Sequence, residues 1–101
     1  MKRQPSPRAA SVFRRWFLAF DGLHRSGTLP SLSAWCADNG FSPSQFRELR
    51  RLYGPGASAA APSRYSAVDL DALFLLADAG VSHEWLLYGR GPMMADGRAA
   101  L

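Results

Sequence analysis

Residues 32–53 read LSAWCADNGFSPSQFRELRRLY, and this stretch decides the fold. It predicts two short helices, at 31–39 and 43–53, on either side of Gly40. Glycine can take the left-handed conformation that ends a helix, so Gly40 marks the turn between the two. Cys36, four residues before Gly40, is small enough to let the second helix approach the first. We interpret the stretch as a helix-turn-helix.

The start of the second helix is marked by four cues that agree. Ser42 is a typical N-cap, Pro43 suits the first helical position, and Gln45 completes an S-x-x-Q capping box. Phe41 and Phe46 stand at the two positions that form a hydrophobic staple across a helix start. These cues predict a helix that begins at Pro43.

That boundary decides which side chains of the 43–53 helix face outward. With about 100° of rotation per residue, Phe46, Leu49 and Tyr53 point inward. The opposite strip is polar, with Gln45 and Arg50 at its edges and Ser44, Arg47, Glu48 and Arg51 along it. Arginine can bond bidentately to guanine, and serine or glutamine can bond to other base edges. The strip therefore suits the major groove of DNA, and the alternative is a solvated helix face.

Charge is distributed unevenly along the 101 residues, whose net charge is +4. Residues 1–64 hold ten Lys/Arg and three Asp/Glu, hence +7, whereas residues 65–101 hold two and five, hence −3. The basic N-terminal part, residues 1–64, favours a surface that binds a polyanion. The alternative is the solvated surface of a protein rich in Arg and Ala. With 48% hydrophobic residues the chain can fold as one small domain.

Composition also bounds the compartment and the chemistry. No apolar run approaches the ~20 residues of a membrane span, and the basic N-terminus is a poor signal peptide. The single cysteine excludes a disulfide framework and a cysteine-rich zinc site. We expect a cytoplasmic, nucleoid-associated protein without a cofactor or an evident small-molecule ligand. Paired carboxylates, a phosphate loop and metal-spaced ligands are missing from the sequence, so an enzyme is not expected.

The chain before residue 32 predicts a basic arm and a long helix. Residues 1–10 are expected to be a disordered arm, which could lie along DNA phosphates or be no more than a loose terminus. Ser11 then caps a helix at about 12–25, in which Arg14, Arg15, Asp21 and Arg25 share the polar face. Its other face carries, at steps of three and four residues, Phe13, Trp16, Phe17, Phe20, Leu23 and His24. This stripe is interpreted as core.

After residue 53 the sequence predicts a flexible loop at 54–65 and two more helices. Ser66 is the expected cap of the fourth helix, which ends at Gly80 and has Leu70, Leu73, Phe74 and Ala77 at core spacing. A fifth helix follows at 83–88, with Val81 and Leu86 as a second staple. Residues 95–101 are expected to be a flexible tail.

Two segments resemble one family. Residues 32–51 look like the helix-turn-helix of the lambda-repressor-like family, also called XRE or phage CI-type repressors. Residues 80–93, GVSHEWLLYGRGPM, are similar to the GVS-x-EWLL-x-G-x-G-x-M ending of many small repressors of that family. With the 12–25 helix, the resemblance spans roughly residues 12–94. Two departures are Cys36, where alanine is usual, and the 54–65 loop, which is longer than common.

The resemblance implies a compact all-α domain of five helices over residues 11–94, with the helix-turn-helix at helices two and three. It also implies a sequence-specific double-stranded DNA-binding transcriptional regulator, usually a repressor, that binds inverted repeats as a homodimer. Its base-reading positions fall on Ser42, Ser44, Gln45, Arg47, Glu48 and Arg51. Phosphate contacts are expected from Arg50, Arg14, Arg15, Lys2 and Arg3.

A second hypothesis is a protein-interaction module of the same fold, antitoxin-like or adaptor-like. Its partner would bind the face of the 81–88 helix that carries Trp85, Leu86 and Leu87. Cys36 is expected to be a small buried residue, with a redox-sensing thiol as a distant alternative.

Overall fold

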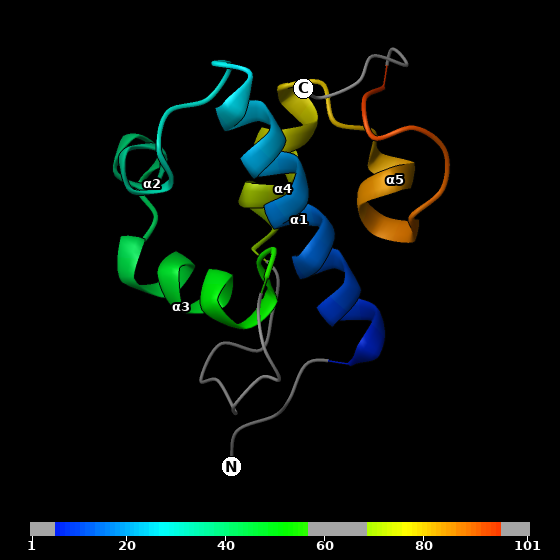
Figure 1. Cartoon of the computed structure of the whole chain (residues 1–101), viewed down its shortest axis with the longest axis horizontal. Coiled ribbons are helices and arrows are strands. Elements are labelled where there is room, and N and C mark those ends of the chain that lie inside the picture. The colour runs from blue at the N-terminus through cyan, green and yellow to red at the C-terminus, as the bar shows by residue number, and fades with distance from the viewer. Residues whose placement is uncertain (1–5, 57–68, 96–101) are drawn as a thin grey trace.

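The longest helix, α1 (Pro7–Arg25), runs through the middle of the molecule (Figure 1). The structure is a computed structural model that describes residues 6–56 and 69–95. The other helices within these ranges are α2 (Leu32–Asn39), α3 (Pro43–Tyr53), α4 (Leu70–Asp78) and α5 (His83–Tyr88). These ranges contain no strand, so the prediction of a compact all-α fold is confirmed.

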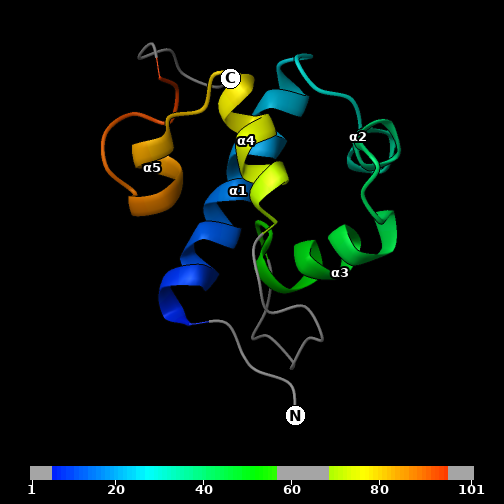
Figure 2. The ribbon, with the colours of Figure 1, turned by 180° about the vertical axis from the view of Figure 1, so that it is seen from behind.

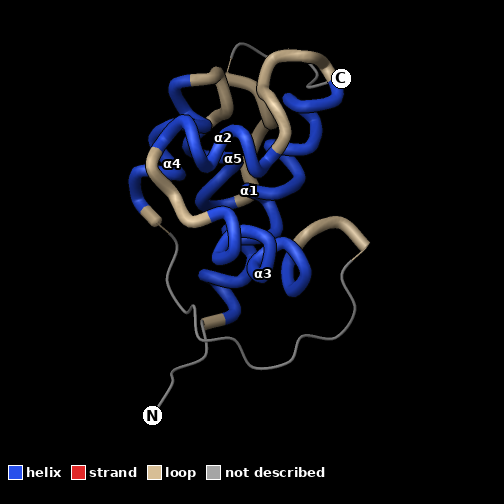
Figure 3. Tube along the Cα trace, turned by 90° about the vertical axis from the view of Figure 1, so that its left-hand side faces the viewer, coloured by secondary structure: helices blue, strands red, loops and turns tan. Residues whose placement is uncertain are grey.

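The short helices surround α1. In Figure 1, α2 and α3 lie on one side of α1 and α5 lies on the other, and the view from behind in Figure 2 shows α4 against α1. Helix α1 contacts α3, α4 and α5, and α2 packs on α3. In Figures 1 and 3, α3 lies below α2, α4 and α5, at the level of the N-terminal part of α1.

Trp16 joins α1 to the three helices that follow it in the chain. Its ring centroid lies 5.3 Å from that of Trp35 in α2 and 5.4 Å from that of Phe46 in α3. Its indole Nε1 donates a buried hydrogen bond of 3.0 Å to the carbonyl oxygen of Ala72 in α4. The predicted apolar stripe is core at Phe13, Trp16, Phe17, Phe20 and Leu23, which are all buried. His24 is exposed, because one further step of about 100° carries it past the edge of the core.

Helix α1 begins earlier than the sequence indicated. Its N-cap is Ser6, whose side chain accepts from the Ala9 N–H at 3.1 Å, and Pro7 occupies the first turn. Ser11 lies inside the helix, where its hydroxyl donates to the Pro7 carbonyl oxygen. Residues 7–10 therefore belong to the helix and not to a disordered arm. The remainder of the expected arm, residues 1–5, lies outside the described residues.

Helix α4 differs from its prediction in both cap and buried face. Asp69 is the N-cap, and its Oδ1 accepts from the N–H groups of Asp71 and Ala72. Ser66, the expected cap, lies outside the described residues. Ala72 and Leu76 are the buried residues of α4, whereas Leu70 and Phe74 are 67% and 59% exposed. The face is rotated because the small Ala72 lies against α1, where its carbonyl receives the Trp16 hydrogen bond.

The segment after α5 folds back on the turn between α4 and α5. Val81 and Met94 form an isolated antiparallel bridge, and Met94 is buried. The Ser82 N–H donates to the Met93 carbonyl at 2.8 Å, and the Ala95 N–H donates to the Gly80 carbonyl at 2.8 Å. Ala95, the first residue of the expected tail, is thus hydrogen-bonded to the domain. Residues 96–101, and residues 57–68 of the long connection, lie outside the described ranges.

Candidate nucleic-acid interface

The turn between α2 and α3 has the predicted geometry. Gly40 ends α2 in the left-handed conformation, with φ of 78° and ψ of 20°. The Phe41 N–H donates to the Cys36 carbonyl at 2.9 Å, which is the 6→1 hydrogen bond of a Schellman motif. The Ser42 side chain then accepts from the Gln45 N–H at 3.2 Å. Phe41 and Phe46 lie 5.3 Å apart between ring centroids, so cap and staple both form and α3 begins at Pro43.

The apolar side of α3 is buried against α1 and α2. Phe46, Leu49 and Tyr53 are buried as predicted. Leu52 is buried as well, which the sequence assignment did not include. The rings of Tyr53 and Phe13 stack with 4.9 Å between centroids, so the C-terminal end of α3 is held on α1.

The opposite side of α3 presents a polar strip, defined here as Ser44, Arg47, Glu48 and Arg51. Ser44, Arg47 and Arg51 are exposed and Glu48 is half-buried. Within residues 6–56 and 69–95, neither Arg47 nor Arg51 forms an ion pair. Ser42, at the turn, is also exposed. The strip therefore offers two arginine side chains to a ligand from one regular helix.

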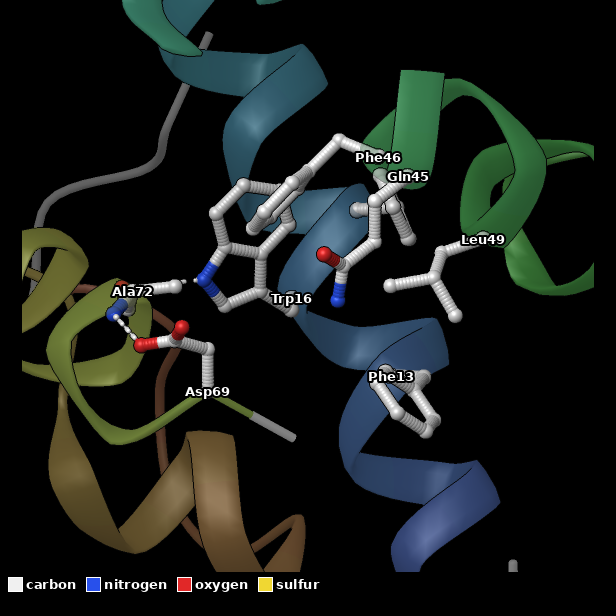
Figure 4. Close-up of a pocket in the computed structure, with 8 residues that line it drawn as sticks. Phe13, Trp16, Gln45, Phe46, Leu49, Asp69 and Ala72 are labelled. Carbon is white, nitrogen blue, oxygen red and sulfur yellow. Dashed lines mark hydrogen bonds between the residues drawn. The ribbon is translucent and has the colours of Figure 1, made fainter. Parts of the chain in front are cut away.

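Gln45 does not share the strip. Its side chain is half-buried and lines a narrow crevice between α1, α3 and α4 with Phe13, Trp16 and Asp69. In Figure 4 the Gln45 carboxamide reaches toward Trp16. The backbone N–H of Gln45 donates to the Ser42 side chain and so forms the N-cap hydrogen bond of α3. This placement counts against the expectation that Gln45 reads bases.

Arg50, whose side chain is 43% exposed, forms an ion pair with a buried carboxylate. Its two terminal nitrogens lie 2.8 and 3.0 Å from the two carboxylate oxygens of Asp21 in α1, a bidentate ion pair. Asp21 is only 8% exposed, although the sequence placed it on the polar face of α1. The pair joins residues 29 positions apart, which no local pattern reveals. Arg50, which the sequence assigned to phosphate contact, therefore forms a structural link between α1 and α3.

Removing the Arg50 guanidinium is expected to destabilise the fold. In Arg50→Met, the Asp21 carboxylate would stay buried without its partner, at a cost of about 1–3 kcal/mol in the free energy of unfolding. Asp21→Asn in the same chain should recover part of that loss, because no charge would then be buried. Urea unfolding followed by circular dichroism measures both. Arg51→Met is the matched control, and an equal effect of the two single changes would refute the role of the pair.

Two arginines of α1 differ in what they contact. Arg15 donates from Nε to the Leu86 carbonyl at 2.8 Å and from a terminal nitrogen to the Leu87 carbonyl at 2.9 Å. These are carbonyls at the C-terminal end of α5, so Arg15 caps that helix instead of facing the polar strip. Arg14 is exposed, with its guanidinium 6.0 Å from the Tyr53 ring centroid at the end of α3. Lys2 and Arg3 lie outside the described residues.

Cys36 is fully buried, as expected of a small residue beneath α3. Burial raises the pKa of its thiol, and the nearby Arg47 guanidinium partly opposes this effect. A buried thiol with a raised pKa is mostly protonated near neutral pH, which disfavours reactivity.

No family model, no curated protein and no solved structure matches the chain. No helix in the described ranges has both the length and the apolar character that crossing a membrane requires. The same part of the chain holds no group of three or more His, Cys, Asp and Glu residues placed to bind a metal ion.

Proposed function

We propose that this protein is a sequence-specific double-stranded DNA-binding transcriptional regulator, acting as a repressor. In this proposal α3 enters the major groove, and a homodimer binds an inverted repeat of DNA in the cytoplasm. The resemblance of residues 32–51 and 80–93 to lambda-repressor-like proteins supports this assignment. A resemblance to a family does not by itself establish function, which depends on the residues of the site.

The observation that carries the proposal is the polar strip of α3. Helix α3 lies below α2, α4 and α5 in Figures 1 and 3, and its outward side chains Ser44, Arg47 and Arg51 are exposed. Arg47 and Arg51 are exposed there on successive turns, while Phe46, Leu49 and Tyr53 hold the other side. In recognition helices of this kind, a few exposed side chains reach base edges and arginine most often selects guanine.

The proposal uses fewer residues than the sequence indicated. Arg47 and Arg51 are the proposed base readers, with Ser44 and Glu48 beside them and Ser42 at the start of the helix. Arg14 of α1, which lies beside Tyr53 at the C-terminal end of α3, is the proposed phosphate contact. Gln45, Arg50 and Arg15 are omitted, because their side chains line the core crevice, bind Asp21 and cap α5 respectively.

Selection of bound duplexes from a random DNA library tests the proposal directly. We expect an enriched motif with two half-sites related by inversion, because a twofold dimer places two copies of α3 on one face of DNA. The distance between half-sites would give the dimer spacing. Arg47→Ala with Arg51→Ala should abolish the enrichment. A library that yields no motif with the unaltered protein would overturn the proposal.

Salt dependence separates phosphate contacts from base contacts. Binding to the selected duplex should weaken steeply with salt, with a log–log slope of about −0.9 for each phosphate contact. Arg14→Ala should make that slope shallower by about 1 and weaken all sequences alike. Fluorescence anisotropy at several salt concentrations measures the slope. A flat salt dependence of the unaltered protein would contradict binding through a basic face.

A protein-interaction role remains the second candidate, and one observation favours it. Of the face predicted on the 81–88 helix, Leu86 is buried and Trp85 is half-buried, whereas two large apolar side chains of α4, Leu70 and Phe74, are exposed. Exposed apolar patches on small proteins often mark contacts with other proteins.

A further inference from the structure

Helix α4 presents three sectors around its axis. Ala72 and Leu76 form the buried sector against α1. At about 100° per residue, Leu70, Leu73 and Phe74 form a second, apolar sector that turns toward α5. Asp71 and Asp78 form a third sector beside it, and both are exposed. The apolar sector of Leu70, Leu73 and Phe74, called here the apolar lane, therefore lies beside the acidic sector. The acidic sector, Asp71 and Asp78, is called the acidic lane.

The apolar lane borders a hollow between α4 and α5. The hollow has a volume of about 280 Å³ and is lined by Leu70, Leu73, Phe74, His83, Leu86 and Leu87. Leu86 is buried at its base, whereas Leu70 and Phe74 are more than half exposed and Leu87 is 37% exposed. Leaving such side chains in water is unfavourable by roughly 25 cal/mol for each Å² of apolar surface. The hollow is thus a site where an apolar partner would gain free energy of binding.

The acidic lane borders a second hollow, on the other side of Phe74. This one is about 550 Å³ and lies between α4 and the turn after α2, with Asp69, Asp71 and Asp78 among its lining residues. Phe74 lines both hollows, so the two are neighbours. Among residues 6–56 and 69–95, no lysine or arginine lines either hollow. Asp69 caps α4, but Asp71 and Asp78 carry exposed carboxylates that favour a cation.

We infer that this surface of Leu70, Phe74, Leu87, Asp71 and Asp78, called here the α4 surface, binds an amphipathic helix of a partner protein. The partner helix carries large apolar side chains on one face and lysine or arginine along one flank. Its apolar face fills the hollow between α4 and α5, and its basic flank meets Asp71 and Asp78. Apolar anchors at helical spacing are the usual way in which a helix occupies a groove. The inference is independent of DNA binding, because the surface contains no residue of the polar strip.

Charge argues against a second copy of this chain as the occupant. A twofold contact places the same surface on both sides, so Asp71 and Asp78 of one copy would face those of the other. Like charges held together across an interface are unfavourable. DNA is excluded for the same reason, since its phosphates would meet the acidic lane. A basic amphipathic helix satisfies both lanes together.

Three synthetic peptides of about 15 residues, near the minimum length for a stable helix, test the inference. They share leucine and phenylalanine anchors and differ along one flank, which carries lysine, glutamine or glutamate. Binding to the full chain is followed by titration calorimetry. We expect the lysine peptide to bind at least tenfold more tightly than the glutamate peptide, with glutamine between them. Equal binding of the three peptides, or no binding, would overturn the inference.

Variants of the α4 surface locate the contact. Phe74→Ala should weaken the lysine peptide at least tenfold, and Asp71→Lys with Asp78→Lys should reverse the order of the three peptides. Leu18→Ala and Ser33→Lys are the controls, because Leu18 is 46% exposed on α1, Ser33 is exposed on α2, and neither residue nor its chain neighbours line either hollow. Circular dichroism confirms that each variant is folded. Equal effects of the controls would overturn the inference.

The oligomeric state gives a further decisive outcome. Light scattering on the unaltered chain and on Phe74→Ala should give the same mass. If Phe74→Ala converted a dimer to a monomer, the occupant would be a second copy and the inference of a basic partner would be wrong. Phe74→Ala should also leave binding to a selected DNA duplex unchanged, so a failure of the peptide experiment is distinct from a failure of the proposed DNA function.

Discussion

Trp16→Ala is expected to lower the free energy of unfolding by about 3–5 kcal/mol. Trp16 is 3% exposed, and its ring lies 5.0–5.4 Å, between centroids, from the rings of Phe17, Phe20, Trp35 and Phe46. Truncation would leave a cavity where α1, α2 and α3 meet and would leave the Ala72 carbonyl without its donor. Small domains have only about 5–15 kcal/mol of stability in total. Trp16→Ala should therefore unfold at a markedly lower urea concentration than the unaltered chain.

Urea unfolding followed by circular dichroism at 222 nm measures this effect. Trp16→Phe keeps an aromatic ring but removes the indole N–H and part of the ring, so its loss should be smaller than that of Trp16→Ala. Leu18→Ala is the matched control on the same helix, because Leu18 is 46% exposed. That change should alter stability by no more than about 0.5 kcal/mol. If Trp16→Ala and Leu18→Ala had similar effects, the central position of Trp16 would be refuted.

Arg47→Ala or Arg51→Ala is expected to weaken specific DNA binding by about 1–3 kcal/mol, roughly 5-fold to 150-fold. Each substitution removes a donor pair that can bond bidentately to one guanine, so the preference at one base pair of each half-site should relax. Neither residue is buried, so folding stability should change little. Titration of the selected duplex, and of duplexes changed at single base pairs, measures both effects.

Two further substitutions make that experiment specific. Arg47→Lys keeps the charge but not the planar fork of donors, so it should relax base preference while the salt slope is retained. Arg90→Ala is the matched control, because Arg90 is exposed beside the Tyr88 ring and lies outside the polar strip. It should leave specific affinity nearly unchanged. Full operator affinity in both Arg47→Ala and Arg51→Ala would rule out the assignment of base readers.

The elements that could be predicted are those specified by neighbours in the chain. The start of α3 depends on the Ser42 cap, on Pro43 and on the staple between Phe41 and Phe46, five positions apart. Both the cap hydrogen bond and the staple contact form. Gly40 ends α2 because a left-handed residue is needed at one position. The start of α1 was open to the same reasoning, since Ser6 and Pro7 repeat the cap-and-proline pair of Ser42 and Pro43. The prediction of Ser11 as the cap was therefore wrong, because Ser6 carries the stronger cue.

The features that were missed depend on contacts between distant residues. An apolar repeat shows that a helix has an apolar face, but not whether α1 covers it, so Leu70 and Phe74 were assigned to a core that Ala72 and Leu76 occupy. The pair of Arg50 and Asp21 likewise arises only when α1 and α3 pack together. Of the candidate site, the outward direction of Arg47 and Arg51 followed from helical geometry alone. The separate roles of Arg14 and Arg15 required the positions of α3 and α5.

The ion pair between Arg50 and Asp21 has a consequence for the thermodynamics of any complex that α3 makes. Helix α3 is held near its start by the rings of Phe41 and Phe46, and near its end by that pair. A ligand of the polar strip would meet a helix that is already ordered, so the entropy lost on association would come mainly from the side chains of Arg47 and Arg51. The heat-capacity change of binding would then report the surface buried in the contact, without an added contribution from folding.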